Sequence, residues 1–204
     1  MPQAGPNPYA WHNWYHCVGS TYATWLPGDP RGFRAFQHTI HINGDYKNPP
    51  PAGNDAGLHH IKQRDLKHPP VVLNTEQQHI IAQAMTEKLL DDGCEPIALT
   101  VSANHFHLLA RFPLLDHTKT ERHKSQTLQD GRDPSPRHHL GRARRHASFK
   151  LTEASLKPES PVWAARPKCE PIKDRSHQVN VARYIQRHHK EGATVWLHHK
   201  GILP

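Results

Sequence analysis

Two neighbouring segments with the pattern of short β-strands constrain the fold of this chain more than any other feature. Residues 97–102 form an apolar run, and after a short turn residues 105–112 alternate between two sets of side chains. Successive side chains of a strand point to opposite faces of a sheet, so His105 and His107 are expected on one face and Phe106 on the other. Because so few residues separate the two segments, they predict a hairpin and therefore an antiparallel sheet.

The rest of the chain predicts one further strand, an extended segment and three helices. Asn74 and Gln77 form the capping-box pattern that begins a helix, and Gly93 is placed to end it. The other segments are a strand at residues 14–22, a basic helix at 138–156, an extended segment at 161–172 and a last helix that begins after Asp174 or Ser176 and ends at Gly192. This order predicts an α+β fold, an antiparallel sheet with helices packed on it.

The remaining segments are predicted to be loops around a single domain. Residues 1–10 are rich in proline and are expected to be flexible, so the domain is expected to span residues 11–204. Residues 43–70 and 113–136 lack sustained periodicity and are read as surface insertions, the first with a short helical turn near residues 58–66.

The composition favours a polyanionic partner in a reducing compartment. The formal charge is +8 and the pI is near 9.6, a balance that favours nucleic acid first and an anionic membrane second. The three cysteines are far apart and form no CxxC pair. The chain shows no signal-peptide pattern, and no stretch approaches the roughly 20 apolar residues of a membrane span. A cytoplasmic protein without a membrane partner is therefore expected.

Two basic segments are candidates for contact with nucleic acid. Arg31 and Arg34 lie in a loop with aromatic residues, which could follow a phosphate backbone or could be a structural turn. Arg142, Arg145 and Lys150 lie on the predicted basic helix, which would present them to phosphates or simply to solvent.

Four residues are candidates for chemistry. Two imidazoles on one strand face could hold a metal ion, although 20 histidines among 204 residues also produce such pairs by chance. Tyr184 and His188 are four residues apart and share one face of the last helix. If that helix packs across the strand face of His105 and His107, three imidazoles could hold one ion beside a phenol that attacks a phosphate. Alternatively, Tyr184 is a half-buried helix residue without a chemical role.

These residues, in this order, resemble a known family. Residues 104–109 resemble the His-hydrophobic-His signature of HUH endonucleases. The C-terminal pattern of single-tyrosine transposases related to the REP-associated group is similar to Trp163, Ile172, Asp174 and Tyr184-Ile185. Residues 21–32 and 141–145 resemble an N-terminal stretch of many bacterial members and the start of their basic helix. The resemblance covers about residues 14 to 197.

This resemblance implies a ferredoxin-like sheet and an enzyme that cuts and rejoins single-stranded DNA, commonly hairpin-forming DNA. By analogy, His105 and His107 bind Mg²⁺ or Mn²⁺, and Tyr184 attacks the scissile phosphate to leave a 5′-phosphotyrosine. The implied location is the bacterial cytoplasm, in association with the nucleoid. A monomer or a homodimer fits the resemblance, and the predicted long loops favour a monomer.

The sequence departs from the family pattern at two places. Ala103 stands where a proline often precedes the Asn-His pair, and Gln186-Arg187-His188 replaces the residues that usually follow the tyrosine. The third metal ligand is therefore His188 by spacing, with Gln186 or a water molecule as alternatives. Two other functions remain open, an inactive or domesticated module that binds hairpin DNA or RNA, and a hydrolase that uses a water nucleophile.

Overall fold

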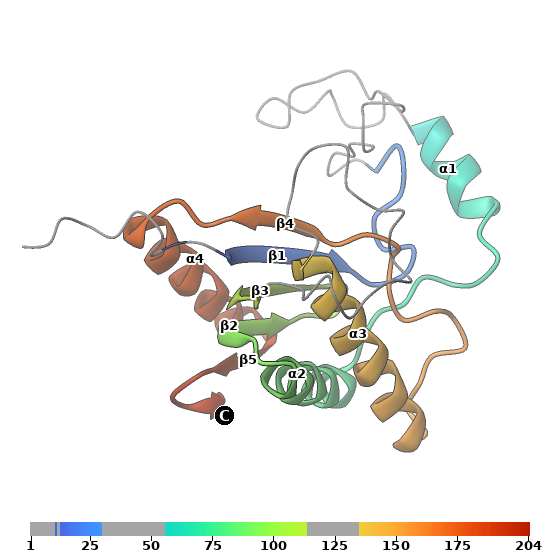
Figure 1. The fold of residues 1–204 in the computed structure, drawn as a ribbon. Coiled ribbons are helices and arrows are strands. Elements are labelled where there is room, and N and C mark those ends of the chain that lie inside the picture. Colours follow the sequence, from blue (N-terminus) through green and yellow to red (C-terminus); the bar gives the residue numbers. More distant parts are fainter. Residues whose placement is uncertain (1–10, 12, 30–55, 114–134) are drawn as a thin grey trace, which may run out of the picture.

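The structure, a computed structural model, describes residues 11, 13–29, 56–113 and 135–204. The described strands form one sheet in the order β4-β1-β3-β2-β5-β6, and each neighbouring pair is antiparallel (Figure 1). The strands are Trp14–Ser20 (β1), Glu95–Val101 (β2), His105–Arg111 (β3), Lys168–Pro171 (β4), Thr194–Leu197 (β5) and Gly201–Ile202 (β6). The helices are Ala56–Arg64 (α1), Thr75–Asp91 (α2), Ser135–Glu153 (α3) and Arg175–Arg187 (α4), and the 3-10 helix η3, His188–Glu191, follows α4 directly.

The first part of this topology is a ferredoxin-like unit. β1, α2, β2, β3, α3 and β4 follow one another along the chain, and their strands lie in the order β4-β1-β3-β2. Each of the two helices thus connects strands that lie on either side of a third strand, the split βαβ arrangement. The predicted α+β fold with a ferredoxin-like antiparallel sheet is confirmed. β5 and β6, which the sequence pattern did not predict, extend the sheet beyond β2.

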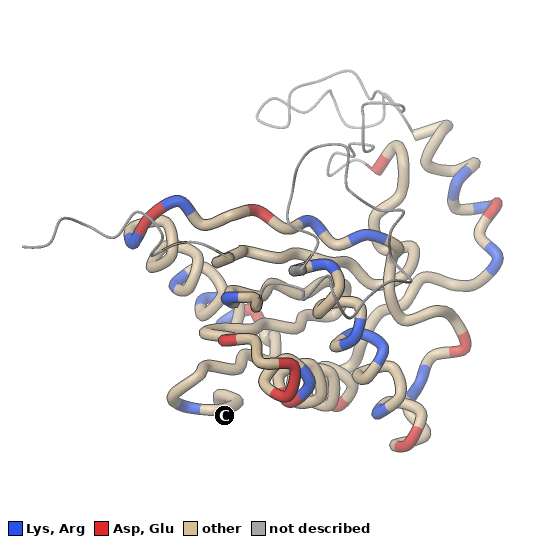
Figure 2. The backbone as a smooth tube through the Cα atoms, viewed as in Figure 1, with Lys and Arg blue, Asp and Glu red and all other residues tan. Residues whose placement is uncertain are grey.

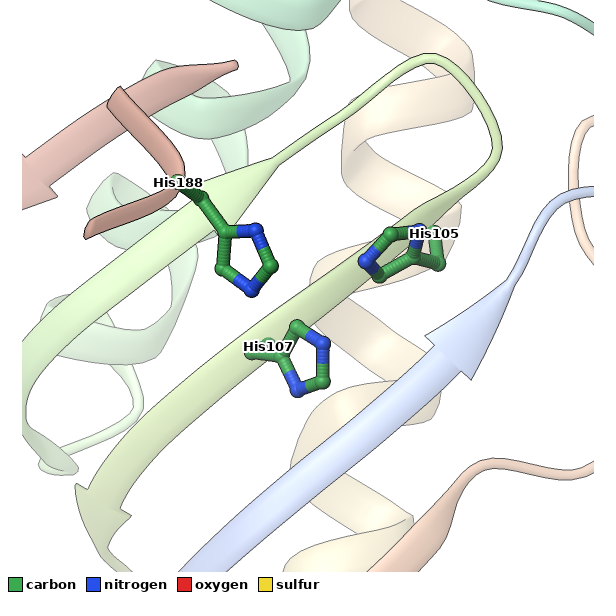
Figure 3. A group of neighbouring side chains, drawn as sticks. All are labelled: His105, His107 and His188. Carbon is green, nitrogen blue, oxygen red and sulfur yellow. The ribbon is translucent and has the colours of Figure 1, made fainter. Parts of the chain in front are cut away.

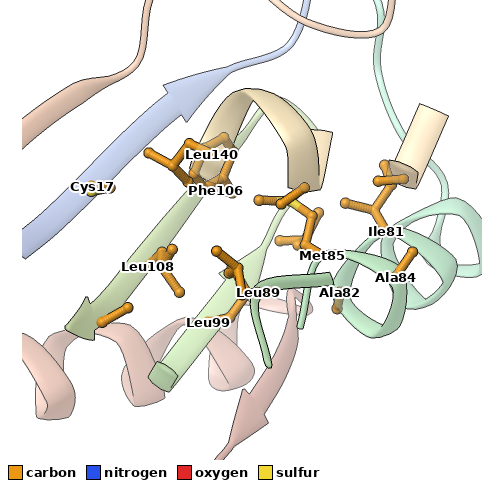
Figure 4. Close-up of a cluster of buried hydrophobic side chains, with 14 of the residues drawn as sticks. Cys17, Ile81, Ala82, Ala84, Met85, Leu89, Leu99, Phe106, Leu108 and Leu140 are labelled. Atoms are coloured by element: carbon orange, nitrogen blue, oxygen red, sulfur yellow. The ribbon is translucent and has the colours of Figure 1, made fainter. Parts of the chain in front are cut away.

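The helices cover the two faces of the sheet unequally. α2 and α3 pack on one face, where Phe106, Leu108 and Leu140 are fully buried (Figure 4). α4 lies on the opposite face, where Leu109 packs with Ile185 (Figure 1). The alternation predicted for residues 105–112 therefore holds, and the face that carries the two histidines is the face that α4 covers.

The predicted beginning and end of α2 are confirmed. The Asn74 side chain accepts a hydrogen bond from the Gln77 backbone N–H, and the Gln77 side chain accepts one from the Asn74 backbone N–H, each at 2.9 Å. Gly93 follows the helix with a φ of 74°, the left-handed conformation that glycine adopts without strain. These caps define where α2 begins and ends.

Gly19 allows β1 to lie against the buried Phe106 ring. A Cβ atom at Gly19 would lie 2.4 Å from Phe106 Cε1 and 2.7 Å from its Cζ. Gly19→Ala is expected to destabilise the protein by about 1–3 kcal/mol, because the ring and the strand must move apart. Gly141→Ala on α3 is a matched control, since nothing lies within 4 Å of the added Cβ. The control should be stabilised by about 0.5–1 kcal/mol. Urea unfolding measures both changes, and equal midpoints for the two variants would contradict this packing role.

Several predictions fall where the structure gives no description. The flexible start at residues 1–10, the positions of Arg31 and Arg34, and most of the two predicted insertions lie outside the described residues. Within the described part of the first insertion, α1 takes the place of the predicted helical turn. All three cysteines are free thiols. None of the described helices is both long enough and apolar enough to cross a membrane.

Candidate metal and tyrosine site

The two histidines of β3 project from the sheet face that α4 covers. His105 and His107 alternate with Phe106, whose ring lies in the core on the other side of the strand. His107 is only 7% exposed, whereas His105, the first residue of β3, is half-buried. Burial is the main cause that lowers the pKa of His107 to about 3, with further contributions from His105, His16 and His188. His107 is therefore a neutral imidazole at neutral pH, the form that binds metal ions.

α4 brings the third imidazole to this face. Asp174 caps the start of the helix, since its side chain accepts a hydrogen bond from the His177 backbone N–H, and the helix buries Val181 and Ile185 toward the sheet. His188 is the first residue of η3 and is 8% exposed. The ligand atoms of His105, His107 and His188 lie within 4.8 Å of one another, and the rings approach one another from two elements (Figure 3). The predicted grouping of the three histidines is confirmed.

Two of these imidazoles are oriented by hydrogen bonds at Nδ1. His105 Nδ1 lies 2.6 Å from Asn104 Oδ1 and 2.8 Å from Ser102 Oγ. His188 Nδ1 lies 2.8 Å from Glu191 Oε2. An imidazole that donates from Nδ1 keeps its lone pair at Nε2. Metal-binding histidines in proteins usually donate their other N–H in this way.

The third imidazole, His107, has a histidine as its outer partner. His107 Nδ1 lies 3.1 Å from Nε2 of His16, and the two rings stack with centroids 5.3 Å apart. His16 belongs to β1, next to β3 in the sheet. If His107 donates from Nδ1 to His16, its Nε2 lone pair faces His105 and His188. All three imidazoles can then present Nε2 to one ion.

The donor set fits a divalent metal ion. His188 Nε2 is buried and has no hydrogen-bond partner among the described residues, so a ligand to this atom would satisfy it. Three imidazole nitrogens carry no negative charge, and imidazole is a common ligand of divalent transition metals. The cluster could therefore bind a divalent metal ion.

Tyr184 lies beside the three imidazoles. Its hydroxyl oxygen is 3.5 Å from His107 Nε2, and its ring meets the rings of His107 and His188 edge-on at 5.0 and 4.8 Å. The side chain remains 38% exposed. The predicted common face of Tyr184 and His188 is therefore observed, with the phenol oxygen at the edge of the cluster and part of the residue exposed to solvent.

The described cations on α3 lie away from this site. α3 packs on the opposite face of the sheet from His107. Arg142 Nε is 2.7 Å from Asp92 Oδ2, and Lys150 Nζ is 2.8 Å from Glu153 Oε2, while Arg145 is exposed. The structure therefore does not bring Arg142, Arg145 or Lys150 to the histidine cluster.

Sequence reasoning missed the outer partners of the cluster. Glu191 follows His188 by three residues, a spacing that places both on one side of a helical turn and could have identified it. His16 could not have been found in this way, because its contact with His107 depends on which strands are neighbours and on their register.

His16 is expected to matter for metal affinity. His16→Phe keeps a ring of similar size but removes the Nε2 atom that can accept from His107, so the affinity for Mn²⁺ should fall by about 10- to 100-fold. Electron paramagnetic resonance of free Mn²⁺ measures this affinity directly. His79→Phe is the control, because His79 is exposed on α2, which packs on the other face of the sheet. Equal affinities of the two variants would show that His107 is oriented without His16.

Comparisons with known proteins match no family model, and they find similarity to a solved structure. No protein-family model matches this sequence, and no curated protein matches it. A solved structure described as the REP associates tyrosine transposase bound to a REP hairpin is similar to 94% of this chain and 75% of that chain. The identity is 13% and the TM-score is 0.43. This degree of similarity is too low to transfer a function, which has to be argued from the side chains of this chain.

Proposed function

We propose that this protein is a metal-dependent enzyme that cuts and rejoins single-stranded DNA through Tyr184, as an HUH-type single-tyrosine transposase. One observation carries the proposal: an exposed phenol whose oxygen is 3.5 Å from a nitrogen of a three-histidine cluster. A phenol is a weak nucleophile at its usual pKa near 10, so a position beside a cation site is what its attack on a phosphate requires. The sequence motifs that contain these residues resemble those of HUH enzymes.

The three histidines would hold the ion through Nε2. A divalent ion there, Mg²⁺ or Mn²⁺, supplies Lewis-acid stabilisation of the negative charge on the phosphate oxygens. His107 has one lone pair at Nε2, so this nitrogen can bind the ion or accept the Tyr184 hydroxyl, but not both. The proton of the phenol therefore goes to solvent, which reaches the exposed side of Tyr184.

The proposed reaction is a transesterification. The Tyr184 oxygen forms a bond to phosphorus as the bond between phosphorus and the 3′ oxygen breaks, and the departing oxygen takes a proton from water. The products are a 5′-phosphotyrosine and a free 3′-hydroxyl. Because one phosphodiester replaces another, a 3′-hydroxyl can reverse the step and rejoin the strands without ATP.

The proposed partner is single-stranded DNA that forms hairpins. The net charge of +8 favours a polyanion. Arg31, Arg34, Arg142, Arg145 and Lys150 are proposed to contact DNA beyond the site, since the described members of this set lie on another face. The protein would act as a monomer or a homodimer in the bacterial cytoplasm.

A covalent adduct with DNA tests this function. The protein is incubated with Mn²⁺ and labelled single strands that carry the inverted repeats flanking its own gene, and the products are separated on a denaturing gel. A labelled band at the mass of protein plus DNA is expected, and EDTA should remove it. Strand cleavage without an adduct would indicate a hydrolase with a water nucleophile. Binding with neither product would indicate an inactive hairpin-binding module.

A further inference from the structure

One guanidinium lies against the phenol at the edge of the histidine cluster. Arg187 is the last residue of α4, and its guanidinium carbon is 5.9 Å from the centre of the Tyr184 ring. The side chain is exposed. It forms no ion pair with any carboxylate that the structure describes, and α4 itself has three arginines and no acidic residue (Figure 2).

Arg187 lies closer to Tyr184 around the axis of α4 than Arg183 does. With 3.6 residues per turn, Arg187 projects about 60° from Tyr184 around the helix axis and Arg183 about 100° in the same direction, so the two arginines are about 40° apart. The buried face of α4 carries Val181 and Ile185. Arg187 is therefore near the rim of the site, and Arg183 points further out into solvent.

The proposed chemistry requires a positively charged group that binds the phosphate. A phosphodiester carries a negative charge, and further charge develops on its oxygens as a nucleophile attacks. A guanidinium is always charged and offers parallel N–H donors that match two phosphate oxygens. Among the candidate site residues, three are imidazoles and one is a phenol, so none offers this fork of donors.

We propose that Arg187 is a phosphate-binding residue, which holds the phosphodiester of a single nucleic-acid strand in front of the Tyr184 oxygen. This inference rests on the proposed function for the role of Tyr184. The contact with the Tyr184 ring keeps the guanidinium at the site before the strand binds. The cations of α3 are the competing candidates, but Asp92 and Glu153 already pair with Arg142 and Lys150.

Salt-dependent binding in a background that cannot form the adduct tests this proposal. Tyr184→Phe keeps the ring against Arg187 and removes the attacking oxygen, so fluorescein-labelled oligo(dT) can be titrated by anisotropy over a range of KCl concentrations. Introducing Arg187→Gln into the Tyr184→Phe protein is expected to weaken its binding to oligo(dT) by about tenfold, because one charge-assisted hydrogen-bond contact is lost. The slope of log K against log salt should also become shallower by about 0.7, as for one phosphate contact to a single strand.

Two matched controls accompany this variant. Arg183→Gln removes the same charge from the same helix, and Lys157→Gln removes one positive charge from an exposed position shortly after the end of α3. Each should change the affinity by less than about twofold, as expected for an isolated surface charge. Arg187→Lys retains the charge without the fork and should bind with intermediate affinity. Melting temperatures confirm that all variants are folded.

The outcomes separate this inference from the proposed function. Equal binding by the Arg187→Gln and Arg183→Gln variants, a larger loss in Lys157→Gln, or no binding of oligo(dT) by the parent protein would overturn the role of Arg187. The adduct assay is independent of these titrations. A loss of binding specific to Arg187, in a protein that forms no adduct, would retain the phosphate site and reject the enzyme.

Discussion

Replacement of Tyr184 by phenylalanine is expected to abolish the covalent adduct, with a loss of about 10⁴-fold or more in its rate of formation. The reason is that no other atom in the site replaces a nucleophile that itself becomes bonded to DNA. Phenylalanine keeps the ring, so the edge-on contacts with His107 and His188 and the packing of Arg187 should persist. The measurement is the rate at which the labelled band appears on a denaturing gel.

The control for this variant is metal binding. Tyr184→Phe should bind Mn²⁺ within about twofold of the parent protein, because the phenol is not one of the three imidazole ligands. A retained metal site with no adduct and no cleavage supports the tyrosine mechanism. Cleavage that continues in Tyr184→Phe would instead assign the nucleophile to water and leave Tyr184 a structural residue.

Local sequence patterns were sufficient for the elements that are defined by their own residues. The alternation at His105 and His107 follows from strand geometry, and the capping box at Asn74 follows from hydrogen bonds within one turn. β5 and β6 were missed because they are short, four and two residues, and exist through their pairing at the edge of β2. No local pattern contains that information.

The site shows the same division between local and long-range information. The spacing of Tyr184 and His188 predicted a common face, although the chain changes from α-helix to 3-10 helix between them. The contact of His16 with His107 needed the register of β1 on β3, 91 residues apart in sequence. The Asp92 carboxylate that pairs with Arg142 is 50 residues away in the sequence. The pattern of basic residues on α3 therefore could not show that part of its positive charge is neutralised.

Replacement of His188 by alanine is expected to decide the third metal ligand, for which Gln186 and a water molecule were the alternatives. His188 Nε2 is buried without a partner in the described structure, next to His105 and His107, whereas Gln186 is exposed on another side of α4. His188→Ala should therefore lower the affinity for Mn²⁺ by about 100-fold or more. Loss of a residue that only orients a ligand costs about 10- to 100-fold, and loss of the ligand itself should cost at least as much. Gln186→Ala should leave it unchanged.

Adduct formation should follow metal affinity across these two variants. With Mn²⁺ well below saturation, His188→Ala should form almost no adduct and Gln186→Ala should form it at the parental rate, while a large excess of Mn²⁺ should restore part of the activity of His188→Ala. Urea unfolding separates this effect from stability, since His188 is also 8% exposed and held by Glu191. If Gln186→Ala loses the metal and His188→Ala keeps it, the glutamine is the ligand. Equal retention by both variants leaves water as the third ligand, because the ion would then depend only on His105 and His107.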